Sequence, residues 1–187
     1  MSQHKIIGFD MDGVIIDHTD LKILLAKDRG FQINRTEAQS DVVEKIIPFE
    51  KWREIQMALY DDRRFALSQP LMSGIQLILG VLKKKGIPYF LISRRKNGEV
   101  AQDLLRARGL WPKYFNKKNT FFVLTKEDKN TKAVELGITH YIDDEPSVLE
   151  KLVDVKNKFL FDPYGAFVKQ NVYKRLTNWE GSRVYFE

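Results

Sequence analysis

The chain has 187 residues, of which 43% are hydrophobic and 30% charged, the composition of a folded globular domain with a sizeable core. It contains no cysteine, and this excludes disulfides, thiolate metal sites and a cysteine nucleophile. The formal net charge of +6 favours anionic partners in general. Nucleic acid is not indicated, because the lysine runs fall where helix ends and loops are expected.

No apolar stretch reaches the roughly 18 residues that a membrane span needs. The first residues also lack the pattern of a signal peptide, since the short apolar run at residues 6–9 is followed at once by acidic residues. We therefore expect a cytoplasmic protein with no membrane partner. The oligomeric state does not follow from the sequence.

The expected elements are a strand, a helical insertion, and then helices and strands in alternation. Residues 5–9 are predicted to form a short buried strand, and residues 20–67 carry apolar residues at helical spacing with no convincing strand. Beyond residue 73 the predicted helices cover 73–85, 98–108, 130–136 and 146–153. The predicted strands alternate with them at 89–92, 120–124, 140–142 and 158–161. This order predicts an α/β fold, a Rossmann-like parallel sheet sandwiched by helices, with a small helical cap inserted after the first strand.

Polar side chains stand where several predicted strands end. Asp10 and Asp12 follow the first strand, Ser93 follows the next, and Asp143 and Asp144 follow a later one. In a parallel sheet these ends share one edge, which is where ligands bind. Four carboxylates so close together would repel one another and raise each other's pKa values. A divalent cation that prefers oxygen ligands resolves this repulsion, and Mg²⁺ is the predicted ion.

A positively charged side chain that offsets the charge of these carboxylates is expected beside them. Lys132 is the predicted residue, because its helix leads directly into the strand that ends at Asp143, while Lys126 and Lys129 are nearby alternatives. Each of these polar residues could also have a purely structural role. The segment Asp-x-Asp-Gly is a common turn, Ser93 could cap the helix that follows, and the paired acids could cap the helix at 146–153.

Taken together, these residues resemble the signature of the haloacid dehalogenase superfamily of phosphohydrolases. That signature is a strand ending in Asp-x-Asp-Gly, a strand ending in Ser or Thr, a lysine, and a strand ending in paired acids. Here the four parts are residues 10–13, Ser93, Lys132 and residues 143–144, in the family's order, and the resemblance spans about residues 5–162. It implies an α/β core at 1–17 and 70–187 and a helical cap at 18–69.

The resemblance also implies a role for each motif residue. Asp10 would attack phosphorus and form an aspartyl-phosphate, and Asp12 would act as general acid and base. Ser93 and Lys132 would hold and neutralise the phosphoryl group. Mg²⁺ would be held by Asp10, by Asp12 through its backbone carbonyl, and by the acid pair, one of which could act indirectly. The members of this acid pair are Asp143 and Asp144.

Further segments resemble the deoxyribonucleotidase-like branch of that superfamily. They are residues 141–144, the run Leu-Phe-Asp-Pro-Tyr at 160–164, and Asn-Trp-Glu at 178–180. The chain departs from the branch in having no residue between Asp162 and Pro163 and in carrying Gly165 where that branch tends to have Asn. The predicted substrate is accordingly a nucleoside monophosphate or another small phosphate ester.

Substrate-binding residues are expected on both sides of the predicted pocket. Arg94 and Arg95 directly follow Ser93, and one of these guanidinium groups is expected to bind the substrate, since arginine binds phosphate bidentately. In the insertion, the ring of Trp52 could stack on a base, although such aromatic residues could equally hold a small helical cap together.

Two other functions fit part of the pattern. A phosphomutase or another phosphotransferase of the same superfamily would pass the phosphoryl group to a second hydroxyl instead of water. A signalling receiver domain also has acidic residues, a Ser or Thr, a lysine and Mg²⁺ around a parallel sheet. In a receiver domain, however, the acid pair comes early and the phosphorylated aspartate ends a middle strand, which is the reverse of the order found here.

Overall fold

The structure, a computed structural model, describes residues 5–186. Its centre is one parallel sheet of six strands in the order β3-β2-β1-β4-β5-β6. The strands are β1 (Ile7–Phe9), β2 (Tyr89–Ser93), β3 (Thr120–Phe122), β4 (His140–Asp143), β5 (Asn157–Phe161) and β6 (Lys174–Leu176). Strand β1 lies between β2 and β4, with Phe9 paired to Leu91 and Ile142. The residues that follow these three strands therefore emerge side by side at one edge of the sheet.

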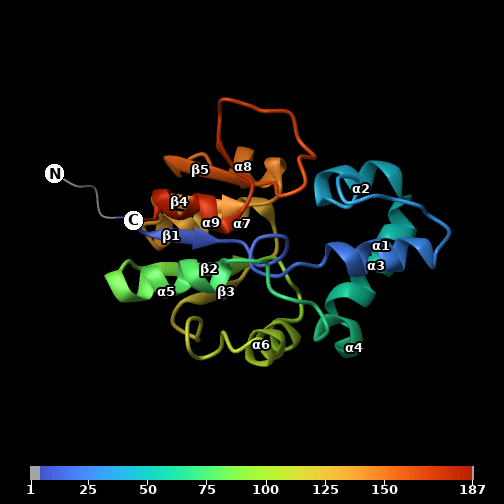
Figure 1. Ribbon diagram of the computed structural model, residues 1–187, viewed down its shortest axis with the longest axis horizontal. Coiled ribbons are helices and arrows are strands. Elements are labelled where there is room, and N and C mark those ends of the chain that lie inside the picture. Colours follow the sequence, from blue (N-terminus) through green and yellow to red (C-terminus); the bar gives the residue numbers. More distant parts are fainter. Residues whose placement is uncertain (1–4, 187) are drawn as a thin grey trace.

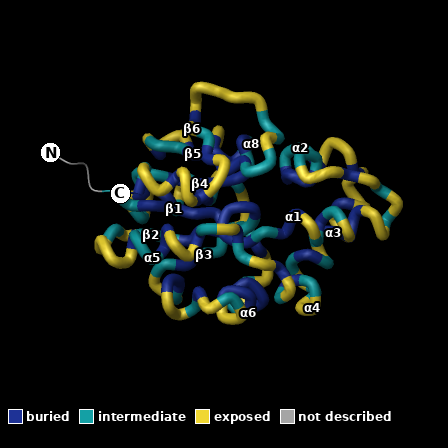
Figure 2. The backbone as a smooth tube through the Cα atoms, in the orientation of Figure 1, coloured by how far each residue is buried: buried dark blue, intermediate teal, exposed yellow. Residues whose placement is uncertain are grey.

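Helices cover both faces of the sheet, as Figure 1 shows. On one face α5 (Ile75–Lys85), α6 (Gly98–Ala107) and α9 (Trp179–Ser182) share a buried apolar cluster with Phe9 and Leu91. On the other face α7 (Lys126–Glu135) and α8 (Pro146–Lys151) share a second cluster with Ile92, Tyr141 and Leu160. A short 3-10 helix, η1 (Arg183–Tyr185), follows α9. Figure 2 shows the strands as the buried layer between these helices. The predicted α/β fold, a parallel sheet sandwiched by helices, is confirmed.

Four further helices stand apart from the sheet, at one end of the molecule in Figure 1. They are α1 (Thr19–Lys27), α2 (Ser40–Ile46), α3 (Phe49–Tyr60) and α4 (Arg63–Ala66). Their inward faces form an apolar cluster of their own, which includes Leu25, Val43, Trp52 and Ile55. The helical spacing read from this stretch of the sequence is thus confirmed, and it reflects a small core distinct from the two that flank the sheet.

The elements that differ from the predicted ones do so for local reasons. Helix α7 begins at Lys126, four residues before the predicted start, because the Thr125 and Asp128 side chains each accept a hydrogen bond from the other's backbone N–H. Strand β6 was not predicted, since Lys174–Leu176 is too short and polar to show a period. Helix α9 was also missed, and its first turn is capped by the Asn178 side chain, which accepts from Gly181 N.

All helices of the described part of the chain are short, and the longest, α3, has 12 residues. Within residues 5–186 no helix has both the length and the apolar character that crossing a membrane requires.

Candidate active site

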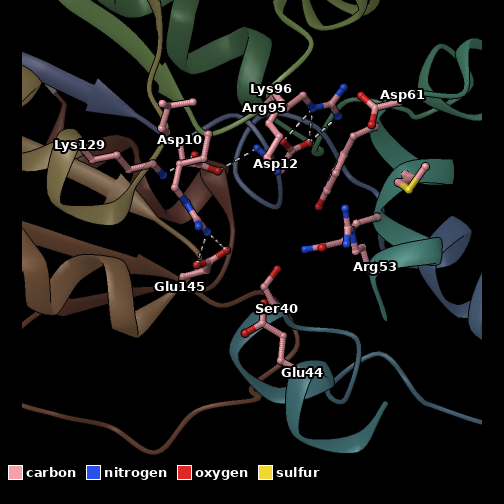
Figure 3. A pocket seen from close by; sticks show the side chains of 15 residues that line it. Asp10, Asp12, Ser40, Glu44, Arg53, Asp61, Arg95, Lys96, Lys129 and Glu145 are labelled. Carbon is pink, nitrogen blue, oxygen red and sulfur yellow. Dashed lines mark hydrogen bonds and ion pairs between the residues drawn. The ribbon is translucent and has the colours of Figure 1, made fainter. Parts of the chain in front are cut away.

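A cavity of about 460 Å³ lies between the carboxyl edge of the sheet and the four-helix group. Its volume is that of a typical small-molecule site. Figure 3 shows side chains from both parts of the chain facing this space. The core contributes Asp10, Asp12, Arg94, Arg95, Lys96, Leu124, Lys129 and Glu145, and the helical insertion contributes Ser40, Glu44, Arg53, Gln56, Met57, Tyr60 and Asp61.

Asp10 occupies the first position after β1 and lies at the inner end of this cavity. Its Oδ1 accepts a hydrogen bond from Lys129 Nζ at 2.6 Å, and its Oδ2 accepts one from Asp12 N at 2.9 Å. Burial raises the pKa of Asp10 to about 7, although the Lys129 ammonium opposes the rise. Both carboxylate oxygens are held, so the group has a fixed orientation toward the cavity.

Lys129, and not Lys132, is the lysine at this centre. Lys129 is 2% exposed, and its Nζ donates to Asp10 and, at 2.7 Å, to Asp143. Burial alone would lower the pKa of Lys129, but these two carboxylates raise it well above its usual value. Lys132 instead pairs with Glu135 at 2.5 Å on the outer side of α7. The prediction of Lys132 is wrong because α7 starts a turn earlier than expected, which turns Lys129 inward.

Three carboxylates lie close together at this centre, and Lys129 binds two of them, Asp10 and Asp143. Asp10, Asp143 and Asp144 each offer an oxygen, and these oxygens lie within 4.8 Å of one another. Burial raises the pKa of Asp143 and raises that of Asp144 well above its usual value. Asp144 Oδ2 is buried and has no hydrogen-bond partner in residues 5–186. A buried oxygen without a partner in an acid cluster is what a hard divalent cation such as Mg²⁺ would satisfy.

We expect Asp144→Asn to have two separate effects: it removes one of the mutually repelling carboxylates, and it removes a ligand of the predicted Mg²⁺. Folding raises the pKa values of these carboxyl groups, so without metal the folded chain binds protons more tightly than the unfolded chain. The stability of the metal-free fold therefore falls as the pH rises above 3.8, the pKa of an unfolded aspartate. For Asp10 this fall continues up to its folded pKa of about 7. At pH 7.5 Asp144→Asn should therefore melt at a higher temperature than the wild type in chelator. Saturating Mg²⁺ should stabilise the wild type, by about 2.7 kcal/mol at 100 times Kd, and leave the variant unchanged.

Calorimetry with and without Mg²⁺ measures both effects. Asp61→Asn is the matched control, because Asp61 is an exposed carboxylate that lines the same cavity outside the acid cluster. An equal Mg²⁺ response in wild type and Asp144→Asn would remove Asp144 from the metal site.

Gly13 is needed where the chain turns away from β1. Its φ is +76°, and a Cβ at this position would lie 2.2 Å from Asp144 Oδ2. Gly13→Ala should cost about 1–2 kcal/mol of backbone strain and should also displace Asp144, with loss of Mg²⁺-dependent stabilisation. Gly109→Ala is the control, because Gly109 has φ +68° and a Cβ added there would meet no atom within 4 Å. Thermal melts with and without Mg²⁺ compare the two variants. If Gly13→Ala and Gly109→Ala lose the same stability and Mg²⁺ stabilises both equally, the steric argument is contradicted.

Asp12 does not join the acid cluster with its side chain. Arg95 Nε and Nη2 donate to its two oxygens, at 2.9 Å to Oδ2 and 2.6 Å to Oδ1. Burial alone would raise the pKa of Asp12, but the Arg95 guanidinium and the nearby His18 hold it below its usual value. His18 Nδ1 lies 3.7 Å from Asp12 Oδ1. The Asp12 carboxylate is thus a partner of arginine. That Asp12 binds Mg²⁺ through its backbone carbonyl stays a prediction.

The remaining predicted residues lie at different depths. Ser93 ends β2 and is 1% exposed, and its Oγ accepts from Arg95 N at 3.1 Å, so it lies beneath the cavity lining. Arg94 lines the cavity and donates through Nη2 to both oxygens of Glu145, at 2.9 and 2.7 Å. Both predicted arginines therefore face the cavity while paired with carboxylates.

Trp52 does not reach the cavity. It is 3% exposed within the apolar cluster of the helical insertion, and its Nε1 donates to Glu44 at 3.3 Å. It shares the buried face of α3 with Ile55 and Leu59, which is the packing position that the spacing of these residues produces. The prediction that Trp52 stacks on a base is corrected accordingly, and the aromatic ring that lines the cavity is that of Tyr60.

Several residues of the site were missed from the sequence. Glu145 binds Arg94 and, at 3.1 Å, Lys126, and His18 stands beside Asp12. The signal for Lys129 was present: Thr125 and Asp128 form a capping pair, which would have placed the helix start before it. Glu145 carries no such local signal, because its partner Arg94 lies 51 positions away in the chain. His18 lies near Asp12 in the chain, but no motif marks the pair.

Comparisons with known proteins bear on the fold. The chain matches no protein-family model and no curated protein in sequence. It does resemble solved structures. A haloacid dehalogenase family hydrolase from Deinococcus radiodurans R1, with bound phosphate and sodium, gives a TM-score of 0.69 at 15% identity, with 99% of this chain and 96% of that one covered.

Two further structures give similar values. A putative β-phosphoglucomutase from Thermotoga maritima has a TM-score of 0.64 at 17% identity, with 97% of this chain and 98% of that chain covered. A predicted phosphoglycolate phosphatase from Haemophilus somnus 129pt has a TM-score of 0.62 at 13% identity, with 99% of each chain covered. The chain therefore has the fold of haloacid dehalogenase superfamily hydrolases. The resemblance to the deoxyribonucleotidase-like branch stays a prediction.

Proposed function

We propose that this chain is a Mg²⁺-dependent phosphomonoesterase that works through an aspartyl-phosphate on Asp10. One observation carries the proposal. Asp10 lines a cavity of small-molecule size and accepts a hydrogen bond from Lys129, and Asp143 and Asp144 lie beside it. A nucleophilic carboxylate, a fixed cation and a set of oxygen ligands for Mg²⁺ are what phosphoryl transfer requires.

The reaction divides into two displacements. In the first, an Asp10 oxygen attacks phosphorus and the bond from phosphorus to the ester oxygen breaks. Asp12 in its protonated form gives a proton to the departing oxygen, which requires its ion pair with Arg95 to open before the step. In the second, Asp12 takes a proton from water, the water oxygen attacks phosphorus, and the bond to Asp10 breaks to release phosphate. Lys129 offsets negative charge at Asp10 throughout, and Ser93 contributes a hydroxyl beneath the phosphoryl group. Mg²⁺ held by the acid cluster would neutralise charge on the phosphoryl oxygens.

We also infer that residues 18–69 form a cap over the core at 1–17 and 70–187. The two connecting segments run together, with Asp17 N donating to Pro70 O at 2.9 Å and Met72 N to Ile15 O at 2.8 Å. Tyr60 and the other insertion residues around the cavity make the cap the part that recognises the leaving group. The separate apolar cluster of the insertion supports its movement as one body.

The proposed substrate is a small phosphate ester. The cavity volume suits one, and enclosure by the cap favours a small ester over a protein surface such as that met by a receiver domain. Nucleoside monophosphates are one class within this proposal. The segments at 160–164 and 178–180 that suggested them have structural contacts, since Asp162 binds Arg175 and Trp179 Nε1 donates to Val14 O.

The test is turnover of p-nitrophenyl phosphate by the purified chain, with Mg²⁺ and with chelator. Hydrolysis should require Mg²⁺. A panel of phosphomonoesters, nucleoside monophosphates included, then identifies the preferred class. Absence of phosphate release from every member with Mg²⁺ present would contradict the proposal.

A phosphotransferase is the second candidate, and the structural likeness to a putative β-phosphoglucomutase favours it. The same aspartyl-phosphate would then pass to an acceptor hydroxyl. Adding sugar phosphates to the assay separates the two functions, because a transferase yields a doubly phosphorylated or isomerised sugar faster than inorganic phosphate.

A further inference from the structure

A second hollow lies at the opposite edge of the sheet from the active site. It is an open groove of about 510 Å³ beside the amino ends of β2 and β3, on the side of the molecule away from the four-helix group in Figure 1. The end of α5, the start of β2 and the loop before β3 line it. No lining residue among those that the structure describes is acidic, whereas five carboxylates line the active-site cavity. The two hollows therefore differ in chemistry as well as in place.

Two lysine runs that are separate in the sequence meet at this groove. Lys83 lies in the last turn of α5, and Lys113 and Lys118 lie in the loop before β3. Lys83 Nζ donates to Lys113 O at 3.0 Å, and the Nζ atoms of these two lysines lie 5.8 and 5.0 Å from the centroid of the Tyr114 ring. Each run alone fits a helix end or a loop, which is why the sequence did not indicate nucleic acid. Their exposed neighbours in the chain are Lys84, Lys85 and Lys117.

No carboxylate offsets the charge of the lysines that line the groove. Within residues 5–186, Lys83, Lys113 and Lys118 form no ion pair with an acidic side chain, and no acidic residue occurs between Asp103 and Glu127. Of the 31 basic and 25 acidic residues of the chain, residues 83–118 hold 11 and 2, so the remainder has 20 basic and 23 acidic. The positive net charge of the chain thus comes from this segment, and lysines gathered without acids attract a polyanion.

The loop that carries Lys113 and Lys118 has a fixed backbone. Asn119 Nδ2 donates to Tyr114 O at 2.9 Å, and Asn119 Oδ1 accepts from Asn116 N at 2.7 Å. Asn116 Oδ1 in turn accepts from Lys118 N at 2.8 Å. A surface held in this way has little backbone freedom to lose when a ligand binds, which favours affinity.

We propose that this groove binds a single strand of nucleic acid. The lysines on its rim contact phosphates, and its apolar part, formed by Pro88, Phe90 and Pro112, contacts bases and sugars. A single strand alternates charged phosphates with flat apolar bases, and the groove has both kinds of lining. A run of acidic residues lacks the flat apolar groups, and a flat membrane surface does not enter a groove. The inference is independent of the proposed function, because the two sites lie at opposite edges of the sheet.

Fluorescence anisotropy of a labelled 12-nucleotide oligouridylate tests this binding with the whole chain. Chelator is present throughout, so that no Mg²⁺-dependent turnover occurs. The logarithm of the association constant should fall with the logarithm of the salt concentration with a slope of about −2, because three lysines each contribute about −0.7. Replacing Lys113 and Lys118 together by glutamine should make the slope shallower by about 1.4 and weaken binding at 50 mM salt by about 10-fold or more. Lys83→Gln, on the other wall of the groove, should make the slope shallower by about 0.7.

Replacing Lys27 and Lys45 together by glutamine is the matched control. Both lysines are exposed on the helical insertion, and this double variant has the same net charge as the groove variant. It should bind the oligonucleotide as the wild type does. Thermal melts show that both double variants are folded, since exposed substitutions of this kind change stability little.

Three results would overturn the inference. Equal losses of affinity in the two double variants would show a general attraction to net charge instead of a site. An oligoglutamate of 12 residues, or an RNA duplex of the same length, that competes as well as the single strand would remove the assignment to single-stranded nucleic acid. Anisotropy of the oligouridylate that stays unchanged with wild type at 50 mM salt would remove the site altogether.

Discussion

Replacing Asp10 by asparagine should abolish turnover while leaving the fold intact. Asparagine keeps the shape of the side chain, but its one carbonyl oxygen can replace only one of the two oxygens that accept from Lys129 and from Asp12 N. Its amide is also a poor nucleophile toward phosphorus. We expect kcat to fall by about 10⁴-fold or more, the scale on which loss of a covalent nucleophile acts. The change also removes a carboxyl group whose pKa burial raises to about 7. This gain offsets the loss of one acceptor, and Lys129 keeps its bond to Asp143, so the metal-free variant should melt close to the wild type.

Steady-state kinetics with p-nitrophenyl phosphate and a thermal melt of the same preparation measure the two effects. Asp61→Asn serves again as control, since it makes the same chemical change at the cavity rim. Turnover within tenfold of the wild type in Asp10→Asn would remove Asp10 as the nucleophile.

Replacing Lys129 by methionine should reduce both activity and stability. Methionine fills similar space without charge and removes the ion pairs that Lys129 makes with Asp10 and Asp143. Breaking a buried ion pair in this way costs about 3–5 kcal/mol, and part of this loss should be recovered in saturating Mg²⁺. Turnover should fall by about 10²-fold or more, since a fixed charge beside the phosphoryl group is lost.

Lys132→Met makes the identical substitution one turn further along α7. Lys132 pairs with Glu135 at the surface, and such pairs contribute about 0–1 kcal/mol, so this variant should keep its kcat and nearly all of its stability. Denaturant unfolding and kinetics on both variants decide the matter. A larger loss of turnover in Lys132→Met than in Lys129→Met would contradict the placement of the lysine.

The architecture could be predicted because strand ends are strong local signals. Each short apolar run before Asp10, Ser93 and Asp143 marks a buried strand, and parallel pairing then brings the three ends to one edge. The order of the strands was not predicted, because alternation with helices is compatible with more than one order. The polar strand β6, helix α9 and the short helix η1 near the end of the chain also lacked such a pattern.

The details of the site depend on features that a local pattern does not contain. The earlier start of α7 brings Lys129 into the helix, where its Nζ reaches Asp10 and Asp143, while Lys132 Nζ lies over the Phe121 ring of β3. The pairing of Arg95 with Asp12 joins residues 83 positions apart, and nothing near either one specifies it. The helical spacing of Trp52 favours a packing role but is also compatible with a binding role, and the buried cluster of the four helices places it in the core.

Trapping the covalent intermediate tests the proposed chemistry most directly. Asp12→Asn should still react with p-nitrophenyl phosphate, which needs no protonated leaving group, but it lacks the base for hydrolysis, so the aspartyl-phosphate should accumulate. After an acid quench and proteolysis, mass spectrometry should find one phosphoryl group on the peptide that contains Asp10, removable by hydroxylamine. A phosphoryl group on another residue, or turnover with none on the protein, would contradict the account.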